Sequence, residues 1–224
     1  MRFKIILTQP TDLVPVNNQH YMNGFIHNII GKNNKYHDRF SDYAISSLQG
    51  GKLCEDKKHL SFNIEPYFFV SSNDFEFIGN FINNISTCNC SMFGMKFKRI
   101  DVLCDFIPNQ YFDHIITISP IILYNEDYTK KCTIKNDIDY LERLNKHCQS
   151  KLKHLGIVDD TFKIEIVKPE CSKEKSIWVG DVFNPCTLSR FKVYGKKETR
   201  FTLYNLGIGC STGSGFGSVD ILKC

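Results

Sequence analysis

A glycine-rich segment near the C-terminus, residues 207–217, constrains this chain most, because five of its eleven residues are glycine. Glycine lacks a Cβ, so its backbone can adopt positive φ and lets another chain approach closely, as in phosphate-binding loops. Only residues 218–224 follow, so the segment does not open a helix as P-loops and dinucleotide-binding loops do. The sequence predicts a loop between two strands, 201–206 and 218–223, that binds an extended phosphate chain. A plain glycine-rich hairpin is the structural alternative.

Composition places the chain among soluble globular proteins, with 42% hydrophobic and 23% charged residues. A net charge of +4 is compatible with a nucleic-acid partner but is not strong support for one. No apolar run approaches the roughly 18 residues of a membrane span, and the first residues are typical of a strand rather than a signal peptide. We therefore expect a cytoplasmic protein with no membrane partner. The ten cysteines are scattered apart from Cys88 and Cys90, so we expect reduced thiols and no metal site.

Hydrophobic periodicity predicts the order strand, helix, strand, strand, helix, strand in the first half of the chain. The strands are expected at residues 2–8, 43–49, 67–70 and 97–105. The first helix starts from a cap at Asn17 or Asn18 and ends by Gly31. The second follows the sequence Asn73-Asp74-Phe75-Glu76, which is typical of a capping box. This order is that of a ferredoxin-like fold.

The second half repeats part of this pattern. Strands are expected at 114–123, 162–167, 191–194, 201–206 and 218–223. One helix runs from Ile138 to Leu155 and stops at Gly156, and no second helix is evident, so this half is expected to be a degenerate copy. The predicted architecture is α+β, with tandem ferredoxin-like domains at residues 1–112 and 113–224 that pack against each other. The glycine-rich loop belongs to the second domain.

Histidines of the first helix are candidates for proton transfer, because histidine changes charge near neutral pH. His20 and His27 are seven residues apart and share a helix face that points away from the apolar side. His37 lies just beyond the helix in a polar loop, next to the cation Arg39. Two such imidazoles can cleave RNA without a metal: one removes the proton of a ribose 2′-OH, and the other protonates the leaving 5′-oxygen.

The remaining charged groups divide into a solvated face and a candidate RNA contact. His147 and His154 are also seven residues apart, on the second-half helix, but no glycine loop adjoins them in the sequence, so we expect a solvated face. The basic residues just before the glycine-rich segment are better placed to contact an RNA backbone. They are Lys192, Lys196, Lys197 and Arg200.

Four stretches carry a resemblance to a known family. The most specific is Gly207-Ile208-Gly209 followed by Gly215-Phe216-Gly217. The others are the N-terminal residues 1–3 with 14–15 and 18–26, the entry to the second half at 118–121, and residues 191–195 before the final strands. Together they span nearly the whole chain. They resemble the CRISPR-associated endoribonucleases of the RAMP superfamily, which cut repeat RNA into guide RNAs.

The resemblance implies tandem ferredoxin-like domains that bind RNA along their junction and cleave it with no metal and no cofactor. It implies attack by the 2′-OH, leaving a 2′,3′-cyclic phosphate and a 5′-hydroxyl. The family's catalytic histidine falls at His37 and a second catalytic side chain at His27. We assign them as general acid and general base, with the reverse assignment open. Some members add a lysine soon after the histidine; none follows here, so Arg39 or Lys52 is the candidate substitute.

The predicted RNA-binding residues combine one side chain of the first helix, the basic cluster and the glycine-rich loop. They are His20, Lys192, Lys196, Lys197, Arg200, Gly207, Gly209, Ser211, Thr212, Gly213, Ser214, Gly215 and Gly217. The expected partner is a CRISPR repeat transcript, while contacts with subunits of a CRISPR interference complex and a homodimer stay open. Two alternatives remain. One is a non-catalytic RNA-binding RAMP subunit of an interference complex, and the other is a small metabolic ferredoxin-like enzyme, which leaves the glycine loop unexplained.

Overall fold

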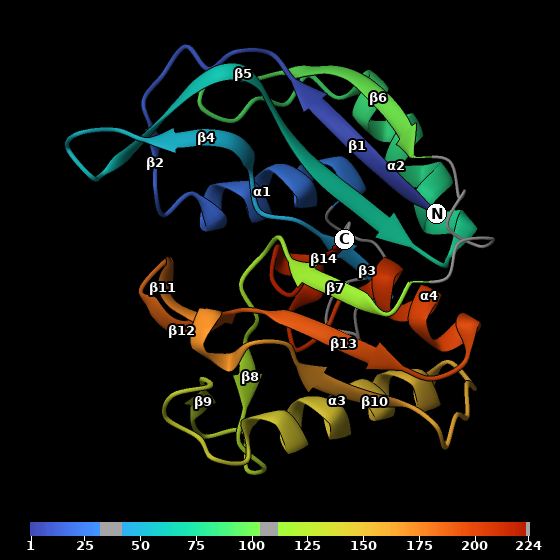
Figure 1. The fold of residues 1–224 in the computed structure, drawn as a ribbon. Coiled ribbons are helices and arrows are strands. Elements are labelled where there is room, and N and C mark those ends of the chain that lie inside the picture. Colours follow the sequence, from blue (N-terminus) through green and yellow to red (C-terminus); the bar gives the residue numbers. More distant parts are fainter. Residues whose placement is uncertain (32–41, 104–111, 223–224) are drawn as a thin grey trace.

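Two larger antiparallel sheets, one from each half of the chain, organise the fold (Figure 1). The computed structural model describes residues 1–31, 42–103 and 112–222. Each sheet packs one face against helices of its own half, and each half has its own buried apolar core. The predicted α+β class is therefore confirmed.

The sheet of the first half has the order β3/β4, β5, β1, β6, with β2 also paired to β5. Its strands are β1 (Arg2–Leu7), β2 (Val14–Pro15), β3 (Tyr43–Ile45), β4 (Gln49–Leu53), β5 (His59–Ser72) and β6 (Phe97–Leu103). Ile5 of β1 and Phe68 of β5 point into a core shared with α1 (Gln19–Ile30) and α2 (Phe75–Thr87). This arrangement is the ferredoxin-like one that the sequence predicts.

The helices of the first half begin and end close to the predicted residues. α1 follows Asn18 and stops at Gly31, and its apolar residues Met22, Phe25, Ile26 and Ile29 are buried. α2 is capped by Asp74, whose carboxylate accepts hydrogen bonds from the amides of Glu76 (2.8 Å) and Phe77 (3.2 Å). The cap is thus one residue later than the start of the predicted capping box. The strand predicted at 43–49 is divided between β3 and β4, and the one predicted at 67–70 is the end of the long β5.

The second half has the sheet order β10, β13, β7, β14, which is again ferredoxin-like. Its sheet and helices are β7 (His114–Thr117), α3 (Tyr140–His154), β10 (Lys163–Ile166), β13 (Arg190–Tyr194), α4 (Lys197–Leu206) and β14 (Val219–Ile221). Two short hairpins are added: β8 (Leu123–Tyr124) with β9 (Lys131–Cys132), and β11 (Lys173–Val179) with β12 (Val182–Leu188). This half therefore departs from the regular pattern through its insertions.

The segment 201–206, predicted as a strand, is instead part of α4. This helix is buried on most sides, because it packs on the core of its own half and also against β3 and β5 of the first half. Asp159 holds its start in place from a distance: its Oδ2 accepts hydrogen bonds from the Lys196 amide and the Thr199 hydroxyl, both at 2.6 Å. Such a contact, 37 residues away in the sequence, gives no local helix signal. The second half thus has the second helix that the sequence did not reveal.

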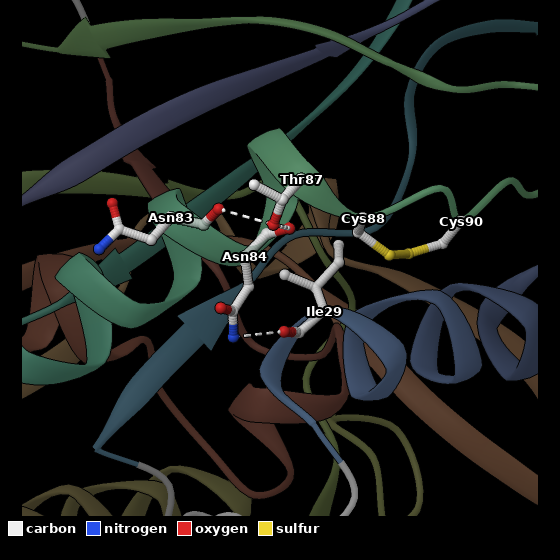
Figure 2. The surroundings of a disulfide bond; sticks show 6 residues. All are labelled: Ile29, Asn83, Asn84, Thr87, Cys88 and Cys90. Atoms are coloured by element: carbon white, nitrogen blue, oxygen red, sulfur yellow. Dashed lines mark hydrogen bonds between the residues drawn. A yellow bond between two sulfur atoms is a disulfide. The ribbon is translucent and has the colours of Figure 1, made fainter.

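A disulfide joins Cys88 and Cys90 just after α2 (Figure 2). The expectation of reduced thiols is therefore wrong for these two residues. The nearby Asn84 side chain donates a hydrogen bond to the carbonyl of Ile29 at 2.9 Å and so ties the end of α2 to the end of α1. This contact fixes the C-terminal end of α1 against its own half.

The two halves pack directly against each other through buried polar contacts. The Arg2 guanidinium donates to the Val219 carbonyl at 2.6 Å and lies over the rings of Phe69 and Tyr204, 4.6 and 4.5 Å from their centroids. The Ser71 hydroxyl donates to the carbonyl of Asn205 at 2.7 Å. Because these groups are buried, each such hydrogen bond also removes the cost of an unsatisfied polar atom.

The predicted domain limit at residue 112 adjoins residues 104–111, which lie outside the described part of the chain. Phe112 itself packs in the core of the second half. The limits 1–112 and 113–224 stay a prediction. In the described ranges, the helices are all too short or too polar to cross a bilayer.

Candidate functional site

The glycine-rich segment leads from the end of α4 to β14, and most of it is buried. Gly207, Gly209, Gly215 and Gly217 are all buried, whereas Ser211 is exposed. The segment folds back on itself and on the entry to β8: the Ile208 amide donates to Gly217 and the Gly217 amide to Pro120, both at 2.9 Å. Much of the backbone that was predicted to cradle phosphate therefore binds protein.

Two of these glycines show why a side chain is excluded. A Cβ at Gly215, whose φ is +86°, would lie 1.8 Å from the side-chain nitrogen of Gln19. A Cβ at Gly217, whose φ is +60°, would lie 1.9 Å from the Ile208 carbonyl oxygen. The space that glycine leaves free at these two positions is occupied by α1 and by the loop itself. An RNA contact of these glycines stays a prediction.

The tip of the segment is its accessible part. Ser211 adopts a left-handed conformation, with φ of 57°, and is followed by the single turn η3 (Thr212–Ser214). Ser211 is exposed, and Gly213 and Ser214 are half-buried. Thr212 points inward and donates to the Tyr43 carbonyl at 3.1 Å. We call Ser211–Ser214 the loop tip; among the predicted loop residues, Ser211, Gly213 and Ser214 stay available to a ligand.

Three elements hold the loop tip in place. From α1, the Gln19 side chain donates to the Ser214 carbonyl at 2.6 Å. From β3, the Tyr43 carbonyl accepts from Thr212. From α3, the Lys151 ammonium donates to the carbonyls of Leu206 (3.2 Å) and Gly207 (3.3 Å) and lies 3.5 Å from the Thr212 hydroxyl. The tip is thus fixed by both halves.

Lys151 is completely enclosed, and burial lowers its pKa to about 8. The burial of Lys151 could have been predicted from the sequence. Lys151 falls on the buried face of α3 together with Leu144, Cys148 and Leu152, so it is a cation at a core position of an amphipathic helix. Gln19 gave no such signal, because a glutamine in the first turn of a helix is unremarkable.

The histidines of α1 lie at different distances from the loop tip. His20 is exposed and directly follows Gln19, which contacts the tip. His27 is half-buried and seven residues later, or roughly 10 Å farther along the helix axis. His37 and Arg39 lie outside the described residues. However, α1 and β3, the elements that border residues 32–41, both contact the glycine-rich segment.

The basic cluster is not one surface. Arg200 is buried, and its guanidinium donates to the carbonyl of Phe112 at 2.9 Å, while its role as an RNA contact stays a prediction. Lys196 donates to the Val158 carbonyl at 3.2 Å, and Lys192 lies 4.0 Å from the Asp113 carboxylate. Lys197 is exposed at the start of α4. The three lysines stay candidates for an RNA backbone contact.

Lys52, one candidate for the missing cation, is exposed on β4, where it pairs with Ser61 of β5.

The prediction that His147 and His154 form a solvated face of α3 is confirmed for one of the two residues. His154 is exposed, but His147 is half-buried and lines a cavity that also reaches Cys210 of the glycine-rich segment.

Comparison with known proteins decides the family. The model of the family "CRISPR associated protein Cas6, C-terminal" matches residues 107–221, which is just over half of the chain. The chain belongs to the Cas6 family. The CRISPR-associated endoribonuclease Cas6 1 of Methanocaldococcus jannaschii is 27% identical to it over 98% of this chain and 92% of that protein.

Solved structures show the same fold over the full length of this Cas6 family member. A CRISPR-associated protein Cas6 superposes with a TM-score of 0.80 at 23% identity and covers 100% of this chain and 99% of its own. A Cas6-related protein from Pyrococcus furiosus gives 0.81 at 22%, covering 100% and 98%. A RAMP protein described as binding different RNA substrates gives 0.82 at 18%, covering 100% of both chains. This chain thus shares its tandem ferredoxin-like architecture with all three structures.

Proposed function

We propose that this protein is an endoribonuclease that cuts CRISPR repeat transcripts into guide RNAs. The observation that carries the proposal is the alignment with a Cas6 endoribonuclease over nearly the whole of both chains. The geometry supports it, because α1, with its histidines, packs against a glycine-rich loop tip that is fixed by several buried contacts. A fixed tip can hold an RNA backbone in one register.

The proposed chemistry is metal-independent transfer of the scissile phosphate to the ribose 2′-oxygen. One imidazole accepts the 2′-OH proton, the 2′-oxygen attacks phosphorus, and the bond to the 5′-oxygen breaks. The second imidazole gives a proton to that leaving oxygen, so the products are a 2′,3′-cyclic phosphate and a 5′-hydroxyl. We assign His37 as general acid and His27 as general base, or the reverse, with Arg39 as the cation that stabilises the developing phosphorane charge.

The RNA is proposed to cross the loop tip next to the start of α1. Ser211, Gly213 and Ser214 offer hydroxyls and an uncrowded backbone there, and His20 is exposed beside Gln19. The buried glycines act indirectly, since they let the tip sit close against α1. Lys192, Lys196 and Lys197 are proposed to contact more distant phosphates.

The test of the reaction is cleavage of a repeat RNA in the presence of a chelator, compared with the same RNA carrying one 2′-deoxynucleotide at the cut. We expect cleavage of the first and none of the second, because the nucleophile is missing. Cleavage of the deoxy substrate would overturn the mechanism. Binding of both RNAs without cleavage would instead identify a non-catalytic RNA-binding subunit.

The test of the assignment is the single-turnover rate of His37→Ala and His27→Ala on the same RNA. Loss of a general acid or base typically lowers the rate by ~10²- to 10⁴-fold. His154→Ala is the matched control, because His154 is an exposed histidine of the second half. A full rate in His37→Ala would remove this residue from the site.

A further inference from the structure

The disulfide between Cys88 and Cys90 takes no part in the function proposed above. It closes a ring over a single intervening residue, Asn89, and the two Cα atoms lie 5.3 Å apart. A disulfide stabilises a fold mainly by restricting the unfolded chain, and this effect grows with the number of residues that the bridge encloses. A bridge across one residue therefore adds little to stability, so its presence calls for another explanation.

The bridge lies at the surface, on the segment that leaves α2 (Figure 2). Cys88 and Cys90 are half-buried, and Asn89 between them is exposed. On their inner side the two cysteines pack against the core of the first half. Their outer side stays open to solvent, so a thiolate can approach the bridge without unfolding of the chain.

The backbone on both sides of the bridge is fixed by contacts of its own. The Cys88 amide donates to the Asn84 carbonyl at 2.8 Å and ends α2. Beyond the bridge, Met92 and Met95 exchange two backbone hydrogen bonds, at 3.0 and 2.9 Å, and both side chains are buried. Because these contacts do not depend on the sulfur–sulfur bond, the dithiol form can keep the same fold. The bridge can then open and close in the folded protein.

The other thiols are less suited to such chemistry. The described part of the chain has six further cysteines, all of them free. Burial raises the pKa of Cys132 and of Cys148 to about 11 and that of Cys186 to about 12, so these thiols are unreactive at neutral pH. Cys171 is exposed and Cys54 is half-buried, but each is a single thiol. Within the described ranges, a dithiol that can close on itself is thus confined to the pair after α2.

We propose that Cys88 and Cys90 form a site of reversible thiol–disulfide exchange, whose co-reactant is a thiol reductant. A thiolate of the reductant attacks one sulfur and forms a mixed disulfide, and the other cysteine leaves as a thiolate that takes up a proton. A second thiolate of the reductant attacks the mixed disulfide and releases the first cysteine, which is protonated in turn. The protein gains two electrons and two protons, and the reductant becomes a disulfide. The proposal goes beyond RNA cleavage and does not rest on it.

The test is equilibration of the full-length protein with mixtures of reduced and oxidised glutathione, followed by acid quenching and alkylation. Mass spectrometry of the peptide that contains residues 88–90 then gives the fraction of dithiol. We expect the pair to pass from disulfide to dithiol within these mixtures and to return in oxidised glutathione, whereas structural disulfides resist the glutathione couple. The rate of reduction in the folded protein should lie within about tenfold of the rate in urea, since this rate depends on access to the sulfur.

Two variants and one spectrum complete the test. Cys90→Ser should keep a mixed disulfide with glutathione at Cys88 after free glutathione is removed, because the thiol that would displace it is missing. Cys171→Ser is the matched control: it removes an exposed cysteine outside the pair and should titrate as wild type does. The far-UV circular dichroism of the reduced protein should equal that of the oxidised protein.

Four results would overturn the proposal. They are a pair that stays oxidised in excess reduced glutathione, a pair that stays reduced in oxidised glutathione, reduction that occurs only in urea, and loss of the folded spectrum on reduction. The last two would show a disulfide that serves the fold. Because no arm measures RNA cleavage, a protein that cleaves no RNA can still pass this test.

Discussion

At the scale of single residues, Lys151 decides how the glycine-rich segment is held. Its ammonium group contacts the last carbonyl of α4 and the Thr212 hydroxyl of the loop tip, and it is buried. A buried lysine is costly when charged, and its lowered pKa expresses that cost. The residue thus links the stability of the site to pH.

The first prediction concerns this linkage. The pKa of Lys151 is about 8 in the folded chain and about 10.5 when unfolded, so between these values the unfolded chain binds more protons. Its contribution to the free energy of unfolding therefore rises with pH across this window, by up to ~3 kcal/mol. We expect urea denaturation to show wild type gaining stability relative to Lys151→Met from about pH 7 to about pH 10. Lys153→Met, on the exposed side of α3, should show no such gain. A difference that does not vary with pH would contradict the assignment.

At the scale of elements, the fit between α1 and the glycine-rich segment positions the site. Gln19 lies so close to Gly215 that a side chain at position 215 would displace its amide group, which donates to the Ser214 carbonyl. The fit is also one place where sequence and structure diverge. The sequence marked Gly215 as a point of close backbone approach, but it contained no information on which chain approaches. The answer is α1, almost two hundred residues earlier.

The second prediction tests that fit by a double-mutant cycle. Gly215→Ala should lower the free energy of unfolding by about 1–3 kcal/mol through overpacking against Gln19, in addition to the strain of its positive φ. Gly180→Ala is the matched control, because Gly180 also has positive φ but nothing within 4 Å of an added Cβ. Gln19→Ala should restore part of the loss in the double variant, measured by denaturant titration. Strictly additive effects would show that the two residues do not meet.

At the scale of the whole molecule, the sequence predicted two ferredoxin-like halves that pack against each other, but not the residues through which they do so. Local periodicity is enough to predict α1 and α3 from the sequence, because the apolar residues of each helix recur on one face. It fails for α4, which is buried on most sides and held at its start by the distant Asp159. It also gives no sign that Arg2 is buried between the halves. The periodicity of a sequence does not predict contacts between segments that are far apart in the chain.

The third prediction is that the two halves unfold as one unit through such contacts. Arg2→Ala removes the donor to Val219 and the cation between Phe69 and Tyr204, and leaves a cavity, so it should lower the free energy of unfolding by about 3 kcal/mol or more. Native-state hydrogen exchange should speed up in β7 and β14 as well as in β1 and β5.

Lys4→Ala is the control on the same strand face. Lys4 is half-buried over the Tyr67 ring of its own half, so this substitution should lower the free energy of unfolding by about 1 kcal/mol or less. Faster exchange in the first half alone would show that the halves are energetically independent.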